Sequence, residues 1–496
     1  MLAVANLITL AATGNELLLS RVVPVVNRPL EIRLAPDAKL TGRATLRVAA
    51  NDETLLTTPV ELAHGKSPTW SFTPKTTGYH TATIEFDGAA EPITRRFPVV
   101  WRDLYFLVWP PPEPSERLAY GPLVAQVIDT DHKADVIRQW HDHGADVVPW
   151  VGVPASDASG AISEKAIADW VEGVAEHVKR GCEGIFIDEF GAYPNPHGFE
   201  RMRTICLMLK QLRARFPKLL IMPATAGAIQ RELAIGYKEV GAVALFESYP
   251  TCFTRFFATH NIDSHLAQRI ETARHTDLIH HADQPQGAII LLGTRVIAAH
   301  EEPVVAEIEQ YVRHIKKTAP EMPGIGFYGM RYDGMTAELV RMTDAYYIKP
   351  VVDLRAIRFA PYTAVSGRPV DILVGIHNLG GMAARNVKVH VFAAPFGGGQ
   401  KREIGTITVA EIGNGHMELT QQAEGELIEY QEVNGNRYAV CPYDGQNVVF
   451  LARTTGKVSW TPEKRGYYTI TAEVQPSPDR QYTILDGAMQ ETLLVE

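Results

Sequence analysis

An alternation of short apolar runs with helical patterns over residues 104–328 constrains the fold of this 496-residue chain more than any other feature. The runs are too short for helices and rich in β-branched residues, as buried parallel strands are. They are Leu104–Trp109, Leu123–Ile128, Asp146–Val153, Gly184–Asp188, Leu219–Ala224, Val243–Glu247, Ala288–Leu292 and Gly324–Tyr328. Between them apolar residues recur at helical spacing, as in Glu164–Val178, His265–Ala273 and Pro303–Thr318. Eight such units in about 245 residues predict a central (β/α)8 TIM barrel over residues 103–348.

Residues 1–102 and 349–496 follow another pattern, in which short alternating runs are separated by Asn, Asp, Gly and Pro. A repeat links the two ends: Ser71–Thr81, SFTPKTTGYHT, recurs as Ser459–Thr469, SWTPEKRGYYT. In both copies Thr-Pro and a glycine predict a turn, and the tyrosine after the glycine is expected to bond the backbone of that turn. Chance similarity of two turns is the alternative. The sequence thus predicts an all-β, immunoglobulin-like sandwich on each side of the barrel.

The composition narrows the classes of function. A formal net charge of −9 without a Lys/Arg run argues against a nucleic-acid surface. Four widely spaced cysteines predict neither a disulfide framework nor a zinc site. The chain has no Gly-rich phosphate loop, no Gly-x-Ser-x-Gly elbow and no dinucleotide fingerprint, so we expect no cofactor.

Membrane and compartment signals are weak. No apolar stretch has the length needed to span a membrane. Met1–Ala12 is apolar but lacks a basic start, so it fits a first strand as well as a signal peptide. Compartment and oligomeric state stay open.

Two of the predicted strands end in carboxylates. Asp188 and Glu189 close one apolar run, and Glu247 closes another two strands later. Ligands bind at the carboxyl ends of barrel strands, and acids are rare in buried strands unless they are used there. A pair of carboxylates is the usual equipment for cleaving a glycosidic bond. The alternative is that one acid of the adjacent pair only forms a salt bridge with the next helix.

Other strand ends carry aromatic or polar residues that suit a sugar. An aromatic ring can stack on a pyranose face, and an arginine can position a hydroxyl group or neutralise a carboxylate. The predicted substrate-binding residues are Trp109, Asp129, Trp150, Tyr249, Arg295, Tyr328 and Arg331. Ordinary packing is the alternative for each single aromatic.

Two histidine clusters suggest a metal site at first sight. His141-Asp-His143 and His280-His281 precede predicted strands, which puts them on the barrel face opposite the acids. A catalytic metal needs ligands at the other face. We therefore expect solvated helix ends there and no metal.

GIFIDE at Gly184–Glu189, followed two strands later by FESY at Phe246–Tyr249, resembles the barrel of the spherulin-4-like glycoside hydrolases and the related endo-α-1,4-polygalactosaminidases. In that family an Asp-Glu pair and a later Glu line the cleft. The resemblance implies that Asp188 is the nucleophile or charge stabiliser and Glu247 the acid/base, with Glu189 assisting. It covers only the barrel.

The C-terminal region resembles a second kind of module. Asp371–Gly381 and Asn386–Val391 are similar to adhesion-like sandwich modules attached to bacterial extracellular enzymes, with 411–447 as an insertion or long hairpin. The resemblances imply a secreted or cell-surface protein. The expected function is hydrolysis of a polysaccharide or oligosaccharide. The alternatives are a non-catalytic carbohydrate-binding or scaffolding protein and a metal-dependent hydrolase.

Overall fold

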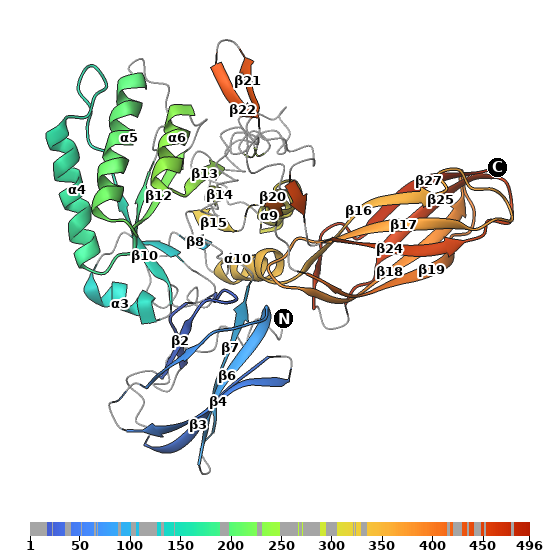
Figure 1. Ribbon diagram of the computed structural model, residues 1–496, viewed down its shortest axis with the longest axis horizontal. Helices are drawn as coiled ribbons and strands as arrows, with labels where there is room; N and C mark the ends of the chain where they lie inside the picture. Colours follow the sequence, from blue (N-terminus) through green and yellow to red (C-terminus); the bar gives the residue numbers. More distant parts are fainter. Residues whose placement is uncertain are drawn as a thin grey trace. The chain divides into compact units, whose positions relative to one another are not determined.

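The structure is a computed structural model (Figure 1). It describes residues 17–21, 23–34, 41–50, 52–63, 66, 68–87, 91–100, 106–108, 126–129, 133–142, 144–188, 198–225, 231–248, 266, 270, 288–293, 305–320, 322, 324–328, 335–413, 417–419, 429–433, 436–440, 448–450, 453–477 and 481–496. The chain forms two compact units, Met1–Thr343 with Gly425–Tyr443 and Asp344–Glu424 with Asp444–Glu496. The expected multidomain organisation is confirmed at this level.

The first unit begins with two antiparallel sheets around one core. One sheet has the order β1-β2-β5 and the other β4-β3-β6-β7. The strands are β1 (Leu17–Leu19), β2 (Leu30–Leu34), β3 (Gly42–Ala50), β4 (Glu53–Leu62), β5 (Thr69–Phe72), β6 (Gly78–Phe86) and β7 (Ile93–Val99). Alternate residues of β3 are buried, and they share a cluster with Ile32 of the other sheet and Ile84 of β6. The two sheets therefore bury a common apolar face.

The same unit continues with eight parallel strands that close into a barrel. They follow one another around it in chain order, and the last pairs with the first. The strands are β8 (Phe106–Val108), β9 (Gln126–Asp129), β10 (Asp146–Val151), β11 (Gly184–Ile187), β12 (Leu220–Thr225), β13 (Ala244–Ser248), β14 (Ala288–Gly293) and β15 (Ile325–Tyr328). The second expected run, Leu123–Ile128, is described only from Gln126.

Helices connect most of these strands. They are α3 (Ala134–Asp142), α4 (Glu164–Lys179), α5 (Gly198–Arg215), α6 (Arg231–Val240) and α9 (Val305–Thr318). A further helix, α10 (Met335–Thr343), follows the last barrel strand. Helices α4, α5 and α6 lie side by side (Figure 1). The helix expected at His265–Ala273 lies almost entirely outside the described residues.

Helix α4 shows how the sequence sets these elements. The Ser163 side chain accepts a hydrogen bond from the backbone N–H of Ala166 over 3.2 Å, which caps the first turn. Ile167, Val171 and Val174 are buried at helical spacing, while the face between them is exposed. The Ser163 cap therefore fixes the start of this helix, and burial of one apolar stripe fixes its orientation.

The second unit is also a pair of sheets, ordered β24-β17-β16-β26 and β19-β18-β25-β27. It starts with a short π-helix, η1 (Asp344–Ile348). Its strands are β16 (Val351–Ala360), β17 (Val370–Asn378), β18 (Ala384–Pro395), β19 (Arg402–Ile412), β24 (Arg453–Trp460), β25 (Gly466–Val474), β26 (Thr483–Ile484) and β27 (Ala488–Val495). One apolar cluster draws on both sheets, including Ile372 and Val389.

Short paired strands lie within the expected insertion at 411–447 and directly after it. Strand β20 (Met417–Leu419) pairs with β23 (Val448–Phe450). Strand β21 (Glu429–Val433) pairs with β22 (Asn436–Val440) as a hairpin.

The repeated turn has the expected glycine but a different tyrosine. Gly78 and Gly466 both adopt positive φ, +125° and +133°, which only glycine adopts easily. The tyrosine that bonds the turn is Tyr468, whose hydroxyl donates to the Lys464 carbonyl over 3.0 Å. Tyr467, which directly follows the glycine, is 58% exposed. The expectation was therefore wrong by one residue in the second copy, because strand alternation turns the first tyrosine outward.

Candidate active site

The interior of the barrel can be recognised from one apolar cluster. Its buried members all come from strands β9 to β14, except Val243, which directly precedes β13, and none of them comes from a helix. They are Ile128, Val148, Phe186, Met222, Ala224, Val243, Leu245, Ile289 and Leu291. A cluster on the outer face would include the helices that cover it. These side chains therefore fill the inside of the barrel.

Alternation along the strands extends this interior set to the carboxyl end. Glu247 is two residues beyond Leu245, and Asp188 is two residues beyond Phe186. Side chains two apart lie on the same face of a strand. Both acids therefore continue the inward-facing rows where β11 and β13 end.

The two acids differ in their exposure. Glu247 is the fourth residue of β13 and only 3% exposed, opposite Leu291 of β14 in the parallel register. Asp188 is the first residue after β11 and is half-buried. A buried carboxylate and a more accessible one thus belong to the same rim. Glu189, the third expected catalytic acid, lies outside the described residues.

Trp150 is the third predicted residue that extends an inward-facing row, two residues beyond Val148 on β10. Its side chain is 43% exposed, although it sits on a barrel strand. The loop after β10 is held in place, because Trp170 donates from Nε1 to the Gly152 carbonyl over 2.7 Å. An exposed indole on a fixed rim is suited to contact a ligand.

The other predicted binding residues can be placed only by chain position. Asp129 and Tyr328 are the last residues of β9 and β15, and nothing is described of their side chains. Trp109, Tyr249, Arg295 and Arg331 lie outside the described residues.

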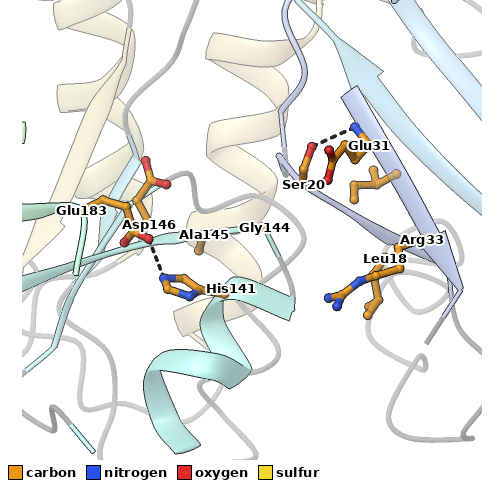
Figure 2. A pocket seen from close by; sticks show the side chains of 10 residues that line it. Leu18, Ser20, Glu31, Arg33, His141, Gly144, Ala145, Asp146 and Glu183 are labelled. Carbon is orange, nitrogen blue, oxygen red and sulfur yellow. Dashed lines mark hydrogen bonds and ion pairs between the residues drawn. The ribbon is translucent and has the colours of Figure 1, made fainter. Parts of the chain in front are cut away.

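A second group of charged residues lies at the amino ends of the strands, around a cleft of about 250 Å³ (Figure 2). Asp146 begins β10, Glu183 precedes β11, and His141 is near the end of α3. The opposite wall of the cleft comes from β1, β2 and the connection between them, with the side chains of Leu18, Ser20, Glu31 and Arg33.

The expectation that His141 is a solvated helix end was wrong. Its Nε2 lies 2.7 Å from Glu183 Oε1, and both side chains are little more than one-third exposed. Glu183 Oε2 also accepts the backbone N–H of Val147 over 2.8 Å. The carboxylate thus ties α3 and β10 to the start of β11. Sequence spacing gives no sign of this contact, because the partners are separated by a strand and a helix.

The cluster shifts two pKa values upward. The hydrogen bond with Glu183 is the main cause that raises the pKa of His141. Burial raises the pKa of Asp146, and the neighbouring Glu183 adds to that rise. Among the residues that the structure describes, no three His, Cys, Asp or Glu side chains form a group that could hold a metal. His143, His280 and His281 lie outside that set.

No described helix is both long and apolar enough to cross a membrane. No protein-family model and no curated protein matches the chain.

Several solved structures are similar to parts or most of the chain. β-Glucuronidase 2 of Bacteroides uniformis is 10% identical over 97% of this chain and 61% of its own, with a TM-score of 0.33, so this chain spans about three fifths of that enzyme. A cycloisomaltooligosaccharide glucanotransferase of a Paenibacillus species is 11% identical over 90% of this chain and 69% of its own, with a TM-score of 0.32. A CARDB domain from Pyrococcus furiosus is 15% identical and covers 30% of this chain and 91% of its own, with a TM-score of 0.18. Identities and TM-scores this low carry no argument about activity.

Proposed function

We propose that the protein is a glycoside hydrolase whose active site lies at the carboxyl rim of the barrel. The observation that carries this is the position of Asp188 and Glu247, which both extend inward-facing rows of the same barrel at the ends of their strands. Two carboxylates facing one hollow are what hydrolysis of a glycosidic bond requires. No cofactor is needed for this chemistry.

The barrel itself is proposed to be a (β/α)8 barrel of the TIM type. Its support is the register of the eight strand pairs. When the residue pairs are traced from strand to strand once around the barrel, the path returns to β10 shifted by about eight residues along that strand. A shift of about eight residues is the shear of a TIM barrel. In that fold the active site lies at the carboxyl ends of the strands, which is where Asp188 and Glu247 are found.

We assign the roles by position and by the resemblance to spherulin-4-like hydrolases. Asp188, the more accessible acid, acts as nucleophile or as the base that activates water. Glu247 protonates the leaving oxygen, and Glu189 assists. A separation of ~5 Å between the two carboxyl groups gives retention of the anomeric configuration, and ~6.5–9.5 Å gives inversion.

The remaining assignments complete the proposal. Trp150 offers its exposed ring to a sugar face. The other substrate contacts are proposed to be Trp109, Asp129, Tyr249, Arg295, Tyr328 and Arg331. The domains are proposed to be residues 1–102, 103–348 and 349–496, with immunoglobulin-like sandwiches at both ends.

The test is release of reducing ends across amino-sugar, acidic and neutral polysaccharides, with and without a chelator. We expect one polymer class to be cleaved, a bell-shaped pH profile, and no effect of the chelator. Glu247→Gln should lose activity by on the order of 10²–10⁴-fold. Glu176→Gln, which removes an exposed carboxylate of α4, is the matched control and should stay active. Glycan binding without turnover would instead support a non-catalytic binding protein.

A further inference from the structure

The second unit gathers exposed aromatic and basic side chains at one end of its sandwich. Three loops meet there, at residues 361–369, 396–401 and 461–465. The Phe396 N–H donates to the Tyr467 carbonyl and the Gly367 N–H to the Pro462 carbonyl, both over 2.8 Å. These bonds join the loops into one surface, which we call the loop end. The C label in Figure 1 lies beside it.

Three aromatic rings are exposed at the loop end. Tyr362 is 85% exposed, Phe396 is 65% exposed and Tyr467 is 58% exposed. Nearly all other large apolar side chains described in this unit pack into or against its core. Of the aliphatic side chains described there, only Val365 is both large and exposed. A surface that docks on a protein core or inserts into lipid normally adds leucine and isoleucine to its aromatics. Val365 belongs to the loop end, so the exposed apolar surface there is three rings and one valine, which fits a ligand that stacks on rings better than one that needs an aliphatic patch.

Four cations accompany the rings at this end. Arg368, Lys464 and Arg465 of the loops and Arg402, the first residue of β19, are exposed and form no ion pair with the described part of the chain. A fifth cation, Lys401, pairs with Glu473. The carboxylates at this end are Glu463 of the loops, Glu496 at the end of β27, and Glu403, which follows Arg402 and lies 3.0 Å from His390. Cations therefore outnumber anions here, whereas the whole chain carries −9.

By contrast, several cations on the strands pair with carboxylates. Arg385 of β18 lies 3.1 Å from Glu411. Lys457 of β24 lies 3.3 Å from Asp371. The excess of positive charge is thus a property of the loop end rather than of the unit.

We propose that the loop end binds an anionic polysaccharide, with rings stacked on sugar faces and cations paired with its carboxylates or sulfates. The charge complementarity selects an anionic partner, and the predominance of rings over aliphatic side chains, of which only Val365 is large and exposed, favours a glycan over a membrane. This binding is separate from hydrolysis in the barrel, although the preference for a glycan rests partly on the proposed function. It would hold the protein on the polymer that the barrel acts upon.

The test uses the full chain carrying Glu247→Gln, so that the polymer is not degraded. Its migration is followed in native gels that contain polygalacturonate, dextran or no polymer. We expect retardation by polygalacturonate only, weakening as salt is added because charge pairs are screened. Lys464→Gln/Arg465→Gln should weaken the association at least tenfold, and Tyr362→Ala/Phe396→Ala/Tyr467→Ala should do the same.

The matched control is Arg385→Gln/Lys388→Gln, which removes two exposed cations toward the other end of β18 and should leave retardation unchanged. Equal loss in the control, equal retardation by dextran, or no retardation at all would overturn the assignment. So would binding to vesicles of phosphatidylserine and phosphatidylcholine without binding to polygalacturonate. A wild-type protein that is retarded but cleaves nothing would remove the hydrolase and leave the loop end standing.

Discussion

Two histidines of the first unit respond to acid in opposite directions. His80 is fully buried between Phe72 and Phe97, with ring centroids 6.0 and 5.8 Å away, and burial is the main cause that lowers its pKa. His141 faces Glu183, and its pKa is raised. The environment of each ring, rather than its place in the sequence, decides whether its pKa is lowered or raised.

For His80 we expect stability of the first sandwich to fall in acid. The unfolded chain takes up a proton near pH 6.5, while folded His80 takes it up only at lower pH, so unfolding is favoured as the pH falls below about 6.5. His80→Phe should remove most of this loss, because a phenyl ring can still stack between the two phenylalanines. Hydrogen exchange of the β6 amides at pH 7.5 and 5.5, corrected for intrinsic rates, measures it. An unchanged pH dependence in the variant would contradict the prediction.

For His141 the dependence of stability on pH has the opposite sign. The raised pKa means that the pair with Glu183 contributes fully below about pH 6.5 and is lost as the pH rises through the folded pKa. The amide of Val147 reports on this, since it donates to the same carboxylate. We expect its protection from exchange to decrease above neutral pH, and to become independent of pH in His141→Gln. Because both side chains are partly exposed, the effect should be small. Equal protection at pH 6 and pH 9 would count against the pair.

At the scale of elements, β11 approaches β12 so closely that its first residue must be glycine. A Cβ built on Gly184 would lie 2.8 Å from the Leu220 carbonyl oxygen and 2.9 Å from its Cβ. Neither atom can move without shifting the strand.

We expect Gly184→Ala to destabilise the first unit by about 1–3 kcal/mol. Gly173→Ala is the control, because Gly173 lies on the exposed face of helix α4 with nothing within 4 Å of the added methyl group. That variant should be more stable by up to about 1 kcal/mol. Urea unfolding followed by fluorescence compares the two. A neutral Gly184→Ala would show that the strands are further apart.

Elements with a clear pattern of apolar residues were the most predictable from sequence. The strand at Gly184–Ile187 and helix α4 follow from an unbroken apolar run and a capped amphipathic stripe. Contacts between distant segments were not predictable. The bond between Arg33 Nη2 and Asp142 Oδ1, 2.6 Å long, joins residues that no local pattern connects. At the second turn, Tyr468 rather than Tyr467 bonds the backbone. Which of the two tyrosines faces the turn depends on the alternation of side chains along the strand, and the motif does not determine this.

At the scale of the whole molecule, the candidate site depends on closure of the barrel. The sequence indicates that Asp188 and Glu247 lie at the ends of their strands. That both side chains face the barrel interior follows only from the interior cluster, which the fold reveals. The exposed rings of the loop end were likewise invisible in the sequence, since Tyr362 and Phe396 look like any aromatic near a strand end.

The most direct measurement is a double-mutant cycle on kcat/KM for reducing-end release by Asp188→Asn, Glu247→Gln and the combined variant. Groups that act on one bond are far from additive when removed together. We predict that each single variant is nearly inactive and that the double variant is about as slow as the slower single one. Full activity in either single variant, or losses that simply multiply in the double variant, would contradict a shared site at the barrel rim.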